Sequence, residues 1–160
     1  MTDLKRTLDA AAGYLTLGLI DEAWEELESL PPELERDHAV LELRCEIYQR
    51  LGRWNSARVL AESMAHRFPE NPAWWLTWAY ALRREQTVQA ARGILWEAAQ
   101  RHPGVPLIVY NLACYACVLG ELDEARRLLA KSIAMDPAMQ KLATTDEDLQ
   151  PLFKVESEGE

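Results

Sequence analysis

The sequence predicts an all-α fold built from repeated pairs of helices. Of its 160 residues, 49% are hydrophobic and 27% are charged, which is typical of a folded protein with one domain-sized core. Glycine and proline are few, at 7 and 8 residues. Long alternating runs of valine, isoleucine and threonine are absent, so helices are favoured over strands. The strongest observation is an internal repeat, because self-similarity at a fixed spacing is the signature of stacked repeat units.

The repeat has a period of 34 residues. An alanine recurs four times at this spacing, and an apolar residue stands three positions before each alanine. A small side chain at this place lets the two helices of a unit approach to about 8–10 Å. Prolines in register close three of the units. The alanines are Ala23, Ala57, Ala91 and Ala125, the apolar residues are Ile20, Trp54, Val88 and Leu122, and the prolines are Pro69, Pro103 and Pro137.

Each unit is predicted to contain two amphipathic helices of about 12–14 residues joined by a tight turn. Gly18, Gly52 and Gly120 follow three of the first helices, where glycine ends a helix in the left-handed conformation at low cost. The third unit has Gln86 there, so its turn must form without glycine. The units span about residues 4–37, 38–71, 72–105 and 106–137; the first helices are predicted at 3–17, 38–51, 72–85 and 106–119, and the second helices at 20–30, 54–67, 88–101 and 122–134.

The segment 138–153 is predicted to cap the last unit. The final helix pair of a solenoid exposes an apolar flank, and a terminal helix commonly covers it. Residues 1–153 then form a single domain, and residues 154–160 are predicted to be an acidic, flexible tail. The apolar residues of the capping segment are Leu142, Leu149, Leu152 and Phe153.

The third and fourth units carry the most regular pattern. It consists of Trp75, Ala79, Ala91, Leu95, Ala98 and Pro103 in the third unit, and of Asn111, Leu112, Ala113, Gly120, Ala125, Leu129 and Asp136-Pro137 in the fourth. These residues resemble the tetratricopeptide repeat (TPR), and the likeness covers about residues 4–137. Thr7 and Leu41 stand where the family often has tryptophan, so the first two units match less well. The resemblance implies a right-handed superhelical solenoid, and the chain's ending is similar to that of many bacterial TPR proteins.

Charge disfavours nucleic acid and anionic membranes as partners. The net charge of −9 opposes the phosphate neutralisation that drives such binding. It is unevenly spread, with ten acidic and three basic residues in 1–37 but two acidic and four basic residues in 72–105. Three cysteines are too few for a disulfide framework, so a cytoplasmic location is expected. The apolar run 10–20 is interpreted as a repeat helix rather than a secretion signal, because it lies inside the first unit.

No residue pattern indicates an enzyme, a cofactor or a metal site. The sequence has no phosphate-binding glycine loop, nucleophile elbow or zinc-binding helix motif. Its histidines, His38, His66 and His102, lie near helix ends in different units. Cys114 and Cys117 share one side of a predicted helix at a Cβ separation of about 5–6 Å, whereas a disulfide needs about 3.8 Å. They are interpreted as small apolar residues, with sensitivity to oxidation left open.

The first helices are expected to line a concave groove, which by the resemblance receives repeat positions two, five, nine and twelve. In the second unit these positions include Glu42 and Glu46, so the basic clamp of chaperone-binding relatives is missing. Trp74 lies outside these positions and is expected either to pack on the neighbouring unit or to stand partly exposed. The last two units are more apolar, which suits peptide docking. The residues predicted to contact a partner are Leu76, Tyr80, Arg83, Leu107, Tyr110, Asn111 and Cys114.

The sequence therefore predicts a non-enzymatic interaction module that binds a peptide or protein segment in its groove, as a monomer or weak homodimer. Two alternatives stay open. One is a chaperone-like holder of a secreted protein, of the type III secretion class. The other is a self-assembling structural subunit whose groove is filled by its own tail or by a second copy.

Overall fold

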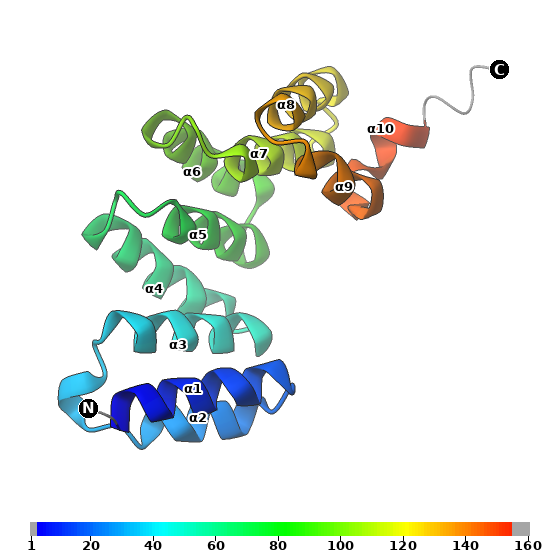
Figure 1. Cartoon of the computed structure of the whole chain (residues 1–160). Coiled ribbons are helices and arrows are strands. Elements are labelled where there is room, and N and C mark those ends of the chain that lie inside the picture. The colour runs from blue at the N-terminus through cyan, green and yellow to red at the C-terminus, as the bar shows by residue number, and fades with distance from the viewer. Residues whose placement is uncertain (1–2, 155–160) are drawn as a thin grey trace.

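The predicted all-α fold is confirmed by a computed structural model, which describes residues 3–154. The helices follow one another in a stack, with the N-terminal pair at one end and the last three helices at the other (Figure 1). No strand occurs in the described range. Within it, no helix is both long and apolar enough to cross a membrane.

Eight helices form the repeated pairs, and their bounds lie within two residues of the predicted ones. A 3₁₀ turn, η1 (Pro32–Leu34), follows the first pair, and a short irregular cap follows the last pair. The cap consists of α9 (Ala138–Thr145), the 3₁₀ turn η2 (Glu147–Leu149) and α10 (Gln150–Lys154). The repeated helices are α1 (Asp3–Thr16), α2 (Ile20–Glu28), α3 (His38–Arg50), α4 (Trp54–Arg67), α5 (Pro72–Glu85), α6 (Val88–Arg101), α7 (Pro106–Val118) and α8 (Leu122–Met135).

The end of the chain differs from its prediction by one residue. Lys154 is the last residue of α10, so it does not belong to the predicted flexible tail. The helix continues because Leu152, which is buried, holds this turn against the rest of the protein. The rest of the predicted tail, residues 155–160, lies outside the described residues.

In three of the four units, the turn between the two helices is made by a glycine with positive φ. Gly18, Gly52 and Gly120 have φ values of 75°, 69° and 80°, in the left-handed region that glycine adopts without steric cost. Gln86 instead ends α5 at φ −125° and ψ −96°. The next helix is then started by Thr87, whose side chain accepts a hydrogen bond from the Ala90 N–H at 3.1 Å.

The repeated alanines are all buried completely, as their proposed packing role requires. Ala23, Ala57, Ala91 and Ala125 each have 0% exposure. The buried side chains around them divide into two clusters, and the boundary runs through α3. Val40 and Ile47 belong to the N-terminal cluster with α1 and α2, while Cys45 belongs to a larger cluster that extends to Leu152.

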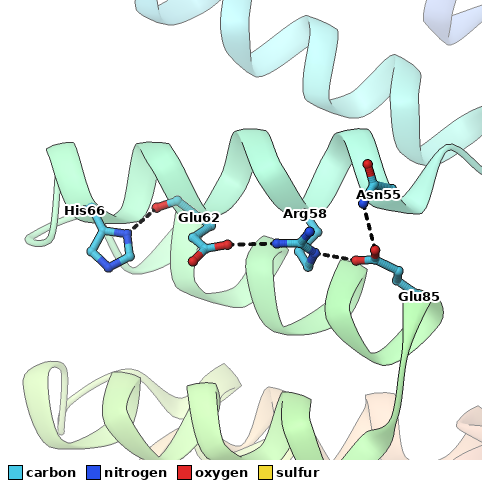
Figure 2. A network of polar contacts seen from close by, with 5 residues as sticks. All are labelled: Asn55, Arg58, Glu62, His66 and Glu85. Carbon is cyan, nitrogen blue, oxygen red and sulfur yellow. Dashed lines mark hydrogen bonds and ion pairs between the residues drawn. The ribbon is translucent and has the colours of Figure 1, made fainter.

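Ion pairs add to the apolar contacts between neighbouring units. Arg58 on α4 contacts Glu85 at the end of α5, and one period later Arg92 on α6 contacts Glu121 after α7. Asn55 also donates to Glu85, at 2.8 Å, and Arg58 donates to Glu62 at 2.9 Å, which makes a chain of polar contacts along α4 (Figure 2). The hydrogen bond from Asn55, with the contact of Arg58, lowers the pKa of the Glu85 carboxyl.

The glycine turns predict that two matched Gly→Ala substitutions change the stability of the protein in opposite directions. Gly120→Ala places a Cβ in the left-handed region, which costs about 1–2 kcal/mol and lowers the melting temperature by about 2–8 °C. Gly93→Ala, inside α6, raises stability by about 0.5–1 kcal/mol because alanine favours the helix. At both positions an added Cβ has no other atom within 4 Å, so the effect is conformational. Thermal unfolding followed by circular dichroism measures both, and equal shifts would contradict this explanation.

Candidate functional site

A pocket of about 150 Å³ opens between α3 and α5. Four of the residues around it, Glu42, Glu46, Gln49 and Ala73, stand at positions that the sequence analysis assigned to the groove. Thr77, Cys45 and Trp74 complete the lining, and of these Cys45 and Trp74 were not expected there. We refer to these seven residues as the α3–α5 pocket.

The α3–α5 pocket is acidic. Glu42 and Glu46 stand one turn apart on α3, and no lysine or arginine lines the pocket. The Glu42 carboxylate has the His38 ring as its neighbour, with Nε2 and Oε1 3.2 Å apart. The Glu46 carboxylate accepts a hydrogen bond from Arg50 at 2.6 Å, and Arg50 also donates to the Leu15 carbonyl at 2.6 Å. Within the described part of the chain, one of the two carboxylates therefore lacks an arginine or lysine partner.

Trp74 forms part of the pocket wall and takes the first of its two predicted places, packed on the neighbouring unit. The residue is only 4% exposed. Its ring lies edge-on to His38 of α3, with ring centroids 5.7 Å apart. Its indole N–H is the single buried side-chain nitrogen or oxygen group among residues 3–154 that has no hydrogen-bond partner. Because buried donors are almost always paired, Trp74 is an exception among these residues.

The Cys45 thiol, also in the pocket wall, stays protonated at neutral pH. Burial raises the pKa of Cys45 from 9.0 to about 12, because a thiolate loses its hydration there. The thiol contacts the Ala57 carbonyl at 3.8 Å. Cys45 therefore contributes an apolar surface to the pocket rather than a nucleophile.

The C-terminal half of the predicted groove carries contacts within the chain itself. The Tyr110 hydroxyl donates to Asp146 at 2.7 Å, and the Cys114 thiol donates to the same carboxylate at 3.5 Å. Arg83 donates two hydrogen bonds to Asp148, at 2.6 and 2.8 Å. Three of the seven residues predicted to contact a partner thus hold the turn η2. We refer to these contacts of Asp146 and Asp148 as the cap lock.

The cap lock keeps its donors protonated. Burial, then the bond to Asp146, raises the pKa of the Tyr110 hydroxyl, and burial with the charge of Asp146 raises the pKa of the Cys114 thiol. The hydrogen bonds to Asp148 raise the pKa of the Arg83 guanidinium. Burial also raises the pKa of Cys117, and both cysteines are free thiols. Hydroxyl, thiol and guanidinium therefore act together as donors to two carboxylates.

The cap lock also contains a set of atoms that could in principle ligate a metal. The Cys114 sulfur and carboxylate oxygens of Asp146 and Asp148 lie within 4.8 Å of one another. Both Asp148 oxygens already accept hydrogen bonds from Arg83, which supplies the positive charge. A metal ion would need the Cys114 thiolate, which burial disfavours. The chemistry of this donor set therefore fits an internal ion pair rather than a metal centre.

Among the described residues, the other four predicted contact residues make no hydrogen bond or ion pair with Asp146 or Asp148. Tyr80 is 42% exposed, and its ring lies edge-on to Trp54 with centroids 5.6 Å apart. Leu107 is 39% exposed. Leu76 and Asn111 are half-buried, and Leu76 packs against the larger core cluster. Their role in binding a partner stays a prediction.

The histidines have local structural contacts. The His102 ring lies 2.8 Å from the Pro69 carbonyl, to which the Trp75 indole also donates, and the His66 ring lies 2.8 Å from the Glu62 carbonyl. These contacts are within a unit or between adjacent units. They do not bring two histidines together.

Comparison with known proteins identifies the fold. Neither a model of a known protein family nor a curated protein matches the sequence. One similar solved structure is TTC0263, a thermophilic TPR protein of Thermus thermophilus, with a TM-score of 0.73 and 19% identity over 97% of this chain and 82% of that one. Another is MamA, with a TM-score of 0.67 and 18% identity over 92% of this chain and 84% of that one. The chain therefore has the TPR solenoid fold that the repeat pattern predicts.

The cap lock predicts that Asp148→Asn loosens the cap. The variant removes the charge that neutralises Arg83, at a cost of about 1–2 kcal/mol for a half-buried pair. We expect a lower urea midpoint together with faster alkylation of Cys114, followed by mass spectrometry. Asp123→Asn is the matched control, because its exposed ion pair with Arg126 contributes little. Equal behaviour of the two variants would show that Asp148 does not hold the cap.

The buried Cys45 thiol predicts slow alkylation of the native protein. With its pKa raised to about 12, the thiolate fraction at pH 8 is roughly a thousandfold below that of an ordinary thiol. The rate with iodoacetamide should keep rising with pH beyond 9 instead of levelling off. The same protein in concentrated urea is the control, where Cys45 reacts normally. Native and unfolded rates within a factor of about ten would contradict the assignment.

Proposed function

We propose that this protein is a non-enzymatic interaction scaffold that binds an extended protein segment along its concave groove, with residues 1–153 acting as one binding domain. The observation that carries the proposal is the α3–α5 pocket. It lies between the first helices of two successive units and is lined by four predicted groove positions. Concave surfaces of this kind are the usual binding surfaces of stacked helical repeats.

The side chains beyond the pocket suit such a ligand. Tyr80 and Leu107 leave about two fifths of their surface uncovered, at 42% and 39%, and such area supplies binding energy when a partner excludes water from it. The Asn111 amide has both a donor and an acceptor for the backbone of an extended chain. Leu76 adds further apolar surface and packs against the larger core cluster.

Arg83, Tyr110 and Cys114 belong to the proposed groove only conditionally. In the described state they bind Asp146 and Asp148 of the same chain. A partner segment reaches them only after the turn η2 has left. The primary contacts that we propose are therefore Leu76, Tyr80, Leu107 and Asn111, together with the α3–α5 pocket.

The alternatives receive less support. No contact within residues 3–154 favours a holder of secreted proteins over other interaction scaffolds. The alternative in which the chain's own tail fills the groove matches only the C-terminal half of the proposed groove. There the filling segment comes from the same chain and not from a second copy. Because this half is satisfied internally, we propose a monomer.

The groove proposal predicts that exposed groove residues determine partner capture. Tyr80→Ala/Leu107→Ala removes the two exposed apolar side chains of the groove, and the loss of two such contacts should weaken partner binding roughly tenfold or more. The matched control is Val59→Ala/Trp96→Ala, which removes apolar side chains of 51% and 40% exposure from the second helices α4 and α6. Tagged proteins, with folding checked by circular dichroism, are compared by affinity capture from a lysate of the source organism.

Partners lost from the groove variant but kept by the control identify the groove as the binding surface. Partners lost only from the control variant would assign binding to the second helices and overturn the proposal. An identical set from both variants and the unmodified protein would do the same.

A further inference from the structure

We propose that the α3–α5 pocket holds the side chain of an arginine from the bound segment; this inference rests on the proposed function and names the chemistry of its ligand. Charge gives the first reason. Glu42 and Glu46 line the pocket without a lysine or arginine among the lining residues. Arg50, which bonds Glu46, is itself 40% exposed, and within residues 3–154 the His38 ring is the one charged or titratable partner of Glu42. The pocket therefore attracts a cation.

The shape of the pocket gives the second reason. Its volume of about 150 Å³ is on the scale of one long side chain. Trp74, Ala73 and Cys45 present apolar surface beside the two carboxylates. Arginine has an aliphatic stem that packs on such surface and a planar head that stacks on an indole and bonds two carboxylates at once. The head of lysine is a point charge without that fork, so arginine fits better.

The unpartnered indole N–H of Trp74 gives the third reason. This buried donor needs an acceptor, and no residue between 3 and 154 supplies one. A free cation has no acceptor to offer, whereas an extended peptide carries a carbonyl oxygen on every residue. A segment that inserts an arginine brings such carbonyls to Trp74, and in the proposal a small rotation of this side chain uncovers its N–H so that one of them accepts from it. The ligand is accordingly a peptide segment and not a metal ion or a polyamine.

A second acidic concavity on the protein provides a control for charge alone. It lies at α1 and α2 and is lined by Tyr14, Glu22, Glu25, Glu26 and Ser29. It has three carboxylates, one more than the α3–α5 pocket, but none of its described lining residues has a buried unpartnered donor. If acidity were enough, a basic peptide would prefer this concavity.

The test is a titration of the full chain, followed by nuclear magnetic resonance, with the capped peptide Ala-Ser-Arg-Ser-Ala. The indole N–H signal of Trp74, assigned by its loss in Trp74→Phe, reports directly on the pocket. We expect it to shift saturably, together with the backbone amides of Glu42 and Glu46. The same peptide with citrulline, which has the shape of arginine without its charge, should bind roughly tenfold or more weakly.

Three variants keep the result interpretable. Glu42→Gln/Glu46→Gln should abolish the shift, while Glu22→Gln/Glu25→Gln, with the same change in net charge, should leave it unchanged. Ala73→Leu fills the pocket without altering charge and should also abolish the shift. Circular dichroism establishes that each variant is folded.

Equal binding of the citrulline peptide would overturn the inference, as would loss of binding in the Glu22→Gln/Glu25→Gln control. The absence of a shift at about 10 mM peptide would also overturn it, because this concentration exceeds the Kd of any binding that would support the inference. Each of these results leaves the groove proposal standing if Tyr80→Ala/Leu107→Ala still loses partners. Loss of the groove proposal itself is recognised separately, by unchanged partner capture in that variant.

Discussion

A pair of helices in this chain cannot bury its apolar surface alone, and most of the architecture depends on that constraint. Each unit has apolar surface on two flanks. The second flank is buried only when the next unit packs against it. The larger core cluster accordingly runs without interruption from Cys45 to Leu152. The completely buried alanines allow this stacking, because they let helices approach closely enough for both flanks to be used. Where the stack ends, the same requirement recruits the cap, whose Leu149 and Leu152 complete the cluster.

The cap lock follows from a second requirement, that a half-buried charge needs a partner. Arg83 is held against the Tyr115 ring, 5.2 Å from its centroid, and its side chain is only 22% exposed. An unpaired guanidinium in such a place is costly, and Asp148 neutralises it with two hydrogen bonds. Asp146 satisfies the neighbouring hydroxyl and thiol in the same way. The acidic sequence of η2 is thus matched to the donors of α5 and α7, as a bound acidic peptide would be.

The parts of the structure that repeat in the sequence were predictable, and the parts that do not repeat were not. The helix bounds, the buried alanines and the glycine turns follow from a period of 34, because equivalent positions meet equivalent surroundings. The contacts of Asp146 and Asp148 have no such basis, since the path of the cap over α7 depends on packing between segments of unrelated sequence. Cys45 was missed as a pocket residue for a related reason: α3 packs on two core clusters, and its share in each is not visible from its own sequence.

The division of α3 between two clusters also explains where the α3–α5 pocket opens. Val40 and Ile47 are drawn to the N-terminal cluster and Cys45 to the larger one, which leaves Glu42 and Glu46 on the side that neither cluster covers. The α3–α5 pocket thus presents carboxylates with no lysine or arginine among its lining residues, whereas the cap lock has a cation, Arg83, already neutralised by the chain's own acid. A segment lying along the whole groove would have to present a basic side chain to α3 and an acidic one to α5 and α7. Under the proposed function, this opposition of charge would favour one orientation of the bound segment over the reverse.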